Sequence, residues 1–290
     1  MVIVGLQGGI GNQMFQYALG RALAYQLDVP LKFDLSNYSE HQLRKFELGN
    51  FNIAGSIASE TDLALAKGYG VPGRILAPLF GSIFKKLRFR TVHEKSLRFC
   101  PDIFAIRGNI YLVGYWQSEK YFAQISSIVR NEFTVRCAID EVNGQRAEQI
   151  GGVTAVSMHV RRGDYVSDAH ATQTLGVLPL DYYQSAVKLV ASRVDTPHFF
   201  VFTDDTVWAK EHIRIAYPLT FVTHNRSEKS FMDIYLMSRC QHNIVANSTF
   251  SWWGAWLNPN LRKIVVAPAA WYRDPAYDPS DLIPSSWERC

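Results

Sequence analysis

Short apolar runs of about five residues alternate along the chain with longer segments in which apolar positions recur every three or four residues. Runs of that length predict buried strands, and the longer period predicts amphipathic helices. In the first part of the chain the pattern predicts strands at 2–6, 31–35 and 110–114 and helices at 12–27 and 119–136. The opening strand, helix and strand form a β-α-β unit, which begins an open α/β sheet.

The alternation is more regular in the second half. It predicts strands at 153–160, 198–203, 219–223, 242–247 and 263–267 and helices at 180–194, 206–216, 228–240 and 250–257. A polar, glycine-containing stretch at 143–152 interrupts the pattern, so we expect two Rossmann-like α/β domains, 1–150 and 151–290. The pattern is irregular between 40 and 110. It also predicts an irregular tail at 270–290, to which it assigns no role.

The composition favours a cytoplasmic protein. The hydrophobic fraction of 48% suffices for packed cores, yet there is no apolar run of transmembrane length and no secretion leader at MVIVGL. The cysteines form no C-x-x-C pair, which favours reduced thiols over zinc or redox chemistry; they are Cys100, Cys137, Cys240 and Cys290.

The net charge of +4 is concentrated near KKLRFR, residues 85–90. The usual interpretation of such a run is a solvated basic face. The alternative is a peripheral contact with an anionic inner membrane or with a lipid-linked acceptor. The run is too weak to indicate a nucleic-acid partner.

The segment HVRRGDY places charge where an apolar run ends. Unpaired buried charge is costly, so Arg161 and Arg162 indicate an anion site rather than a core. The planar fork of arginine suits a diphosphate, and His159 and Arg161, two residues apart, point to the same side of a strand. The alternative is a structural ion pair between Arg162 and Asp164.

The segment GGIGNQM is a glycine turn between a strand and a helix. Such a turn favours phosphate binding at the helix N-terminus. Met14 is too bulky for the third glycine position of a dinucleotide fingerprint, so NAD is disfavoured. Asn12 and Gln13 could hydrogen-bond a ligand, or Asn12 could cap the helix.

Two acidic features follow. In FTDD, we favour Asp204 or Asp205 as a helix cap over a metal site. Asp233 is an isolated acid on a largely apolar helix, so it is either exposed or binds something specific. One such partner is guanine, whose N1–H and 2-amino groups can both donate to a carboxylate.

The segment NSTFSWWGAWL follows a strand. Ser248 and Thr249 offer donors at a helix start, which is a second anion seat. Its tryptophans could stack on a sugar or base, but core packing is favoured for at least two of them. The glycine turn, the arginine pair and this helix start all fall at strand ends, where parallel sheets bind ligands. Together they predict a cleft for a nucleoside diphosphate, with no metal.

In this order, GGIGNQMFQYA, HVRRGDY, FTDD and NSTFSWWGAWL resemble the bacterial α-1,2-fucosyltransferases, glycosyltransferase family 11, from residue 8 to about residue 257. The resemblance implies a GT-B fold, with an acceptor-side first domain and a donor-binding second domain, and no metal or other cofactor. It also implies inverting transfer of fucose from GDP-β-L-fucose to the 2-hydroxyl of a terminal β-galactoside, in surface-glycan or O-antigen synthesis.

By this resemblance His159, Arg161 and Arg162 contact the donor, with Arg161 on the diphosphate. Asp233 meets guanine, and the phosphates are held by Ser248, Thr249 and Phe250. Gly11, Asn12 and Gln13 form the acceptor-side loop, and Asn12 also contacts the donor. Asp164 is the predicted base, with His159 as the alternative. Two other functions stay open, namely a GT-B transferase that uses a UDP- or dTDP-sugar and a carbohydrate-binding module.

Overall fold

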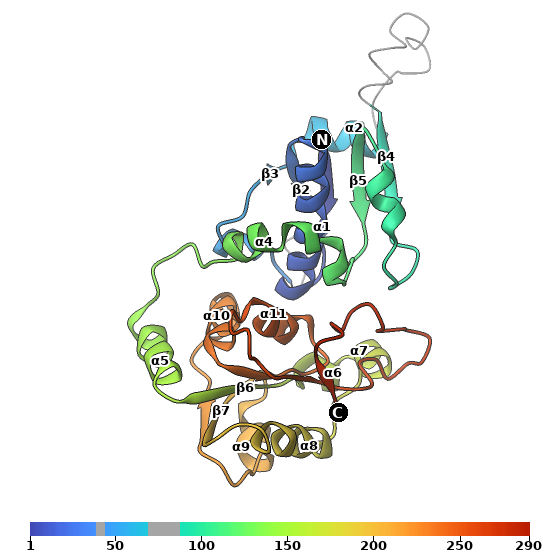
Figure 1. Cartoon of the computed structure of the whole chain (residues 1–290). Coiled ribbons are helices and arrows are strands. Elements are labelled where there is room, and N and C mark those ends of the chain that lie inside the picture. The colour runs from blue at the N-terminus through green and yellow to red at the C-terminus, as the bar shows by residue number, and fades with distance from the viewer. Residues whose placement is uncertain (39–43, 69–87) are drawn as a thin grey trace, which may run out of the picture. The chain divides into compact units, whose positions relative to one another are not determined.

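The computed structural model describes residues 1–38, 44–68 and 88–290, and it divides into two compact units, Met1–Thr134 and Val135–Cys290 (Figure 1). Each unit is built on its own parallel sheet. The loops near 68–82 and residues 85–87 of the basic segment lie outside the described residues.

The first unit holds a sheet of order β3-β2-β1-β5-β4. Its strands are β1 (Val2–Gly5), β2 (Leu31–Asp34), β3 (Ser56–Ile57), β4 (Phe89–His93) and β5 (Asn109–Val113). Helix α1 (Ile10–Leu27) follows β1, and α2 (Glu60–Lys67) begins with a capping box between Ser59 and Asp62. The 3-10 turns η1 (Leu48–Asn50) and η2 (Pro101–Ala105) lie between its strands. The expected β-α-β start is confirmed.

The helix expected at 119–136 is broken into three pieces. These are η3 (Glu119–Tyr121), η4 (Ala123–Ile125) and α4 (Ser126–Glu132). Two neighbouring aromatic residues are both buried here. The ring of Tyr121 packs edge-on against Trp116 at 5.7 Å, and the ring of Phe122 packs against Phe15 at 6.3 Å. Adjacent residues of a straight helix do not share one face, so the backbone turns to bury both.

The second unit holds a sheet of order β11-β10-β9-β6-β7-β8. Its strands are β6 (Thr154–Val160), β7 (Pro197–Thr203), β8 (Leu219–Val222), β9 (His242–Ile244), β10 (Val265–Ala267) and β11 (Glu288–Arg289). Counted within the unit, this is the order 3-2-1-4-5-6 of doubly wound nucleotide-binding folds. The prediction of two Rossmann-like α/β units, the components of a GT-B fold, is confirmed.

Helices cover both faces of this second sheet. In Figure 1, α8 and α9 lie on one side of it and α10 and α11 on the other. The helices of the unit are α5 (Glu141–Gly151), α6 (Gly163–Ser167), α7 (Ala169–Thr174), α8 (Leu180–Ala191), α9 (Thr206–His212), α10 (Phe231–Arg239) and α11 (Thr249–Leu257), with a 3-10 turn η5 (Ser227–Lys229). The two longest strands, β6 and β7, are buried along most of their length and are mostly apolar.

The stretch 143–152, expected as an interruption, is mostly helical. Asp140 caps α5 by accepting a hydrogen bond of 3.0 Å from the backbone N–H of Asn143. The side chains of Asn143 and Asn225 exchange two hydrogen bonds, which attach α5 to the second unit. The division of the chain therefore lies before α5, earlier than the boundary expected at 150.

The tail at 270–290 is irregular up to β11, as expected, but it has a structural role that the sequence did not reveal. Strand β11 pairs in parallel with β10 and completes the sheet. The indole N–H of Trp252 donates to the carbonyl of Leu282 at 2.8 Å, and Trp252 also packs against Trp287. Trp252, Trp253 and Trp256 are all buried, so core packing holds for all three. The tail is part of the core of the second unit.

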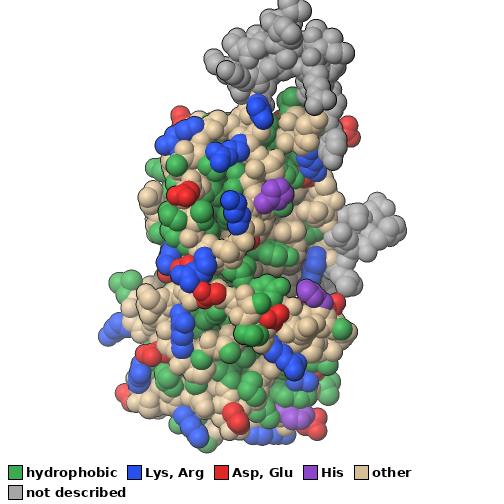
Figure 2. Space-filling model, turned by 90° about the vertical axis from the view of Figure 1, so that its right-hand side faces the viewer, with side chains coloured by type: hydrophobic (Ala, Val, Ile, Leu, Met, Phe, Trp, Pro, Cys, Tyr) green, Lys and Arg blue, Asp and Glu red, His purple; other side chains and the backbone are tan. Residues whose placement is uncertain are grey.

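The described surface does not test whether the basic segment at 85–90 contacts a membrane. On the face shown in Figure 2, acidic and basic side chains are interspersed among apolar ones. The described part of the segment includes Arg88 and Arg90, and both are exposed. In the ranges that the structure describes, no helix combines the length and the apolar character that a bilayer crossing requires. Membrane contact and cytoplasmic location stay predictions.

Replacing Trp287 by alanine tests the structural role of the tail. Trp287 is 6% exposed and packs on Trp252 at 5.5 Å between ring centroids. Loss of a buried tryptophan leaves a cavity, so we expect the unfolding free energy of the second unit to fall by about 3 kcal/mol or more. Urea unfolding followed by circular dichroism measures it. Leu261→Ala is the control, since Leu261 is fully exposed; equal effects of the two variants would contradict a core role for the tail.

Candidate functional site

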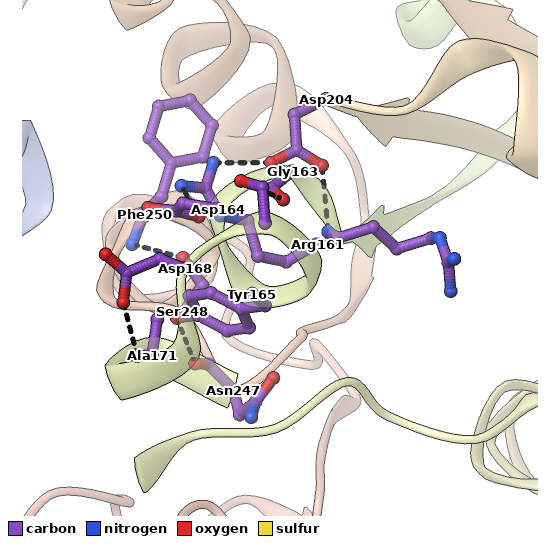
Figure 3. A network of polar contacts seen from close by, with 12 residues as sticks. Arg161, Gly163, Asp164, Tyr165, Asp168, Ala171, Asp204, Asn247, Ser248 and Phe250 are labelled. Carbon is purple, nitrogen blue, oxygen red and sulfur yellow. Dashed lines mark hydrogen bonds and ion pairs between the residues drawn. The ribbon is translucent and has the colours of Figure 1, made fainter. Parts of the chain in front are cut away.

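The loops after β6 and β9 lie side by side at the carboxyl edge of the second sheet. These strands are neighbours, and the order of strands reverses between them. Such a switch point is where open α/β sheets bind ligands. Arg161 follows β6, and Ser248 lies a few residues after β9. Both loops appear in Figure 3, so the structure brings these two predicted anion seats together.

Arg161 is the centre of this site. One guanidinium nitrogen lies 2.8 Å from Asp204 and another lies 2.5 Å from Asp164, and the group sits 5.4 Å over the ring of Tyr165. Burial alone would lower the pKa of Arg161, but the attraction of Asp204 and Asp164 outweighs it and raises that pKa. The buried Nε of Arg161 has no hydrogen-bond partner among the described residues. The arginine is therefore a fixed cation with a donor still unused.

Arg162 is held differently. Its Nε lies 3.2 Å from Asp205, and its guanidinium stacks 3.8 Å from the ring of Trp208 on α9. The alternative of an ion pair between Arg162 and Asp164 gives way to two other pairs, since Asp164 pairs with Arg161 and Asp205 pairs with Arg162. The structure therefore gives Arg162 a packing role beside α9.

The acids of FTDD bind the arginine loop. Asp205 caps α9 by accepting from the N–H of Trp208 at 3.1 Å, as the sequence predicted. Asp204 accepts from the backbone N–H of Arg162 at 2.9 Å as well as from Arg161. Within the described ranges, no three His, Cys, Asp or Glu side chains come together as a metal site would require. Independence from metal stays a prediction.

His159 lies in β6, two residues before Arg161. It is 3% exposed, and its ring packs against Phe250 at 5.4 Å between centroids. Burial lowers the pKa of His159 well below its usual range, more than Asp204 raises it. Its Nδ1 has no hydrogen-bond partner in the described part of the chain. A neutral imidazole of this kind can hydrogen-bond a ligand but is a weak base near neutral pH.

Tyr165 ties the two loops together, and sequence reasoning missed it. Its hydroxyl donates to the backbone carbonyl of Asn247 at 3.0 Å, as Figure 3 shows. Burial raises the pKa of Tyr165 to about 12, so the hydroxyl keeps its proton. Ser248 caps α11 by accepting from the N–H of Phe250 at 3.4 Å, and Thr249 is the first residue of that helix. The only sequence signal for Tyr165 was its place inside HVRRGDY.

Asp233 lies in a separate buried network, so the exposed alternative is wrong. It is 8% exposed and accepts a hydrogen bond of 2.8 Å from Asn225, which in turn bonds Asn143 of α5. The ring of His224 also contacts Asn143, at 3.0 Å. Burial raises the pKa of Asp233 to about 7, and the bond from Asn225 offsets only part of this.

In the glycine turn of the first unit, two of the three residues expected to face the acceptor are buried instead. Helix α1 begins at Ile10 with Gly9 as its cap, so the alternative in which Asn12 caps the helix is wrong. Gln13 is fully buried and donates to the carbonyls of Gly8 and Lys45, at 3.0 and 2.8 Å. It therefore orders the loop. Gly11 is buried inside the helix. Asn12, which accepts from Gln117 at 2.9 Å, is the partly exposed member of the three.

Comparison with known proteins gives the class of protein. The sequence profile of the family described as Glycosyl transferase family 11 matches residues 1–288. The chain therefore belongs to that family, and it is a glycosyltransferase. The sequence resemblance to this family is confirmed.

Three relatives narrow the comparison. The chain is 32% identical to an alpha-1,2-colitosyltransferase of Escherichia coli, over 100% of this chain and 98% of the relative. It is 30% identical to the O-antigen biosynthesis glycosyltransferase WbnK of Escherichia coli, over 97% and 98% of the two chains. It is also 30% identical to the human galactoside alpha-(1,2)-fucosyltransferase 1, over 86% of this chain and 63% of the relative.

The buried carboxyl of Asp233 predicts a pH dependence of stability. Its folded pKa of about 7 lies above the unfolded value of about 4, so the folded state binds the proton more tightly. The stability that the protonated carboxyl of Asp233 contributes is fully present below pH 4, and it is lost as the pH rises through 7. Asp233→Asn should therefore gain stability relative to the parent over this range, by at most about 1.4 kcal/mol per pH unit.

Urea unfolding between pH 4.5 and 8 measures this difference. Asp140→Asn is the control, because hydrogen bonds from Asn143 and Lys229 lower the pKa of Asp140 to about 2. Its loss of stability should stay constant over the same pH range. Parallel curves for the parent and the Asp233 variant would contradict the account of this network.

Proposed function

We propose that this glycosyltransferase transfers L-fucose from GDP-β-L-fucose to the 2-hydroxyl of a terminal β-galactoside, with inversion. The observation that carries the proposal is the fixed guanidinium of Arg161 beside the start of α11, at the switch point of the second sheet. A fork of donors and a helix N-terminus at one edge form a seat for a diphosphate. The wider role is in surface-glycan or O-antigen synthesis, as the name of the second relative suggests.

The chemistry follows from charge. The acceptor oxygen attacks C1 of the sugar from the face opposite GDP, while the bond from C1 to the β-phosphate oxygen breaks and its electrons leave with GDP. The proton of the attacking hydroxyl passes to Asp164 or to water, and the Asp164 variant below separates the two. Negative charge on the diphosphate therefore grows in the transition state. A cation already held by Asp204 and Asp164 stabilises that charge without reorganising. On this account the protein supplies the positive charge, and no metal or other cofactor is needed.

Asp233 supports guanine as the base. One carboxylate oxygen accepts from Asn225, which leaves acceptor capacity on a buried group. Guanine offers two adjacent donors, N1–H and the 2-amino group, whereas uracil and thymine offer a single ring N–H. A titration with GDP, UDP and dTDP separates this proposal from a transferase of another nucleotide sugar. A carbohydrate-binding module would bind none of the three nucleotides.

The sugar itself has a specific alternative, because the first relative is named for colitose. Colitose is fucose without the 3-hydroxyl. A site built to hydrogen-bond that hydroxyl rejects the sugar lacking it, by up to about 10⁴-fold, whereas an apolar pocket discriminates far less. Competition between GDP-fucose and GDP-colitose for one acceptor therefore decides which sugar the site was built for.

The direct test is GDP release from GDP-fucose in excess EDTA, with and without lactose. Release that depends on lactose would support a metal-independent fucosyltransferase acting on a galactoside, and NMR of the product then gives the linkage. Release without dependence on lactose would keep the donor and remove the acceptor. An absence of release, together with an absence of GDP binding, would overturn the proposal.

Arg161→Lys is expected to lower kcat by about 10²–10³-fold, because a lysine cannot reproduce the bidentate fork or both ion pairs. GDP affinity should fall with it. Steady-state kinetics and calorimetric titration measure the two effects. Arg162→Lys is the matched control, since Arg162 is held by Asp205 and Trp208 and should affect GDP affinity far less. Equal losses of kcat and GDP affinity in both variants would contradict the assignment of Arg161, rather than Arg162, to the diphosphate.

Asp164→Asn separates two roles of that carboxylate. The sequence suggested a base, but the ion pair of 2.5 Å to Arg161 makes it a holder of the cation. We therefore expect GDP affinity and turnover to fall together, each by roughly tenfold, as for loss of one charge-assisted hydrogen bond. Lost turnover with intact GDP affinity would instead identify Asp164 as the base.

A further inference from the structure

The first unit has its own switch point, and polar groups gather there. Strands β1 and β5 are neighbours at the place where the strand order turns. The segments that follow them are joined by the hydrogen bond of 2.9 Å from Gln117 to Asn12. Glu94 follows β4 at the same edge, and its backbone N–H donates to Val113 at 2.8 Å. Ligands of open parallel sheets bind at this edge.

The carboxylate of Glu94 is held in one orientation. One of its oxygens accepts from the backbone N–H of Tyr115 at 2.7 Å, and the other accepts from that of Trp116 at 2.9 Å. Burial raises the pKa of Glu94, and these two N–H groups offset only part of the rise. The side chain is nevertheless partly exposed. Each oxygen keeps a lone pair that neither N–H uses.

The backbone around Glu94 is strained. Trp116 has φ of +57°, a conformation that a bulky residue adopts only under constraint. Gly114, at φ of +152°, permits the close approach, since a Cβ there would lie 2.4 Å from the Cβ of Glu94. Strain of this kind is concentrated at ligand sites, where the surrounding structure enforces it. Here the strained turn points two N–H groups at one carboxylate.

One side-chain polar atom at this turn has no partner in the ranges that the structure describes. The indole Nε1 of Trp116 is buried and has no hydrogen-bond partner among the described residues, although the side chain is 3% exposed. It lies within 3.0 Å of the position that a Cβ at Gly114 would take, and so does a carboxylate oxygen of Glu94. Tyr115, between Gly114 and Trp116, is 37% exposed, and it is near enough to Glu94 for the charge of that carboxylate to raise the pKa of Tyr115. A donor, an acceptor and an aromatic face therefore meet at one place.

We propose that Glu94, together with Tyr115 and Trp116, forms the subsite that binds the hydroxyl groups of the acceptor sugar. The assignment rests on the proposed function, because it makes the first unit the acceptor side. The chemistry fits a neutral sugar, whose hydroxyls donate to a carboxylate and accept from an N–H and whose C–H face packs on an aromatic ring. A phosphorylated ligand does not fit, since its charge would repel Glu94.

The first test is Glu94→Gln, with GDP-fucose as donor and lactose as acceptor. The amide has the shape of the carboxyl group but loses the charge and one acceptor oxygen. We expect the KM for lactose to rise by roughly tenfold, the cost of one charged hydrogen bond. GDP affinity and the slow hydrolysis of GDP-fucose by water should not change. Glu60→Gln is the control, an exposed glutamate of the same unit, and should match the parent.

A second variant separates binding from folding. Glu94 also orders the turn, so its replacement could unfold the first unit. The ring of Tyr115 is partly exposed, and Tyr115→Ala should leave the melting temperature near that of the parent while raising the KM for lactose. An unchanged KM for lactose in both folded variants would overturn the subsite. Loss of GDP-fucose hydrolysis in step with transfer would also overturn it, because the effect would then be on the donor.

The behaviour of the parent protein distinguishes a failure of the acceptor subsite from a failure of the proposed function. If the parent shows lactose-dependent release of GDP and the variants keep its KM, only the assignment of Glu94 fails. If the parent shows no GDP binding and no release, the proposed function itself fails. The subsite then falls with it.

Discussion

The guanidinium of Arg161 lies largely enclosed, and a charge in that position must be paired. Asp204 comes from the end of β7 and Asp164 from α6, so two segments distant in sequence converge on one side chain. Gly163 has to be a glycine for the same reason, since a Cβ there would lie 2.6 Å from a carboxylate oxygen of Asp204. The arginine loop, the acidic end of β7 and the strand order of the sheet all serve to hold one cation at the carboxyl edge.

Much of the fold follows from local pattern. Strands such as β6 and β7 are mostly apolar runs, and the alternation of such runs with helices was sufficient to predict a doubly wound unit. Elements that depend on distant partners were not predictable. Strand β11 has two residues and exists because β10 offers it an edge, and α5 contains glycines that local propensity disfavours. Contacts with Asn225 and the cap from Asp140 stabilise α5, and neither shows in periodicity.

The residues of the candidate site were likewise predictable in part from the sequence. The strand-end residues proposed to hold the diphosphate, Arg161 and Ser248, were visible in the sequence because charge or hydroxyls interrupt an apolar pattern. Which carboxylate pairs with which arginine was not visible, because that depends on the register between β6 and β7. Sequence reasoning misjudged Gln13 and Glu94 in opposite ways. The first has the polarity of a ligand group but orders a loop, and the second is inconspicuous in sequence but is held by two backbone donors.

The most direct measurement is amide hydrogen exchange of the chain with and without saturating GDP, in excess EDTA. The account predicts protection in two peptides, those covering 159–167 and 247–251, because the diphosphate would lie on the loops after β6 and β9 and bind the start of α11. A further gain is expected around Asp233. Protection confined to other segments, or none under conditions where calorimetry shows GDP bound, would contradict the placement of the donor on Arg161.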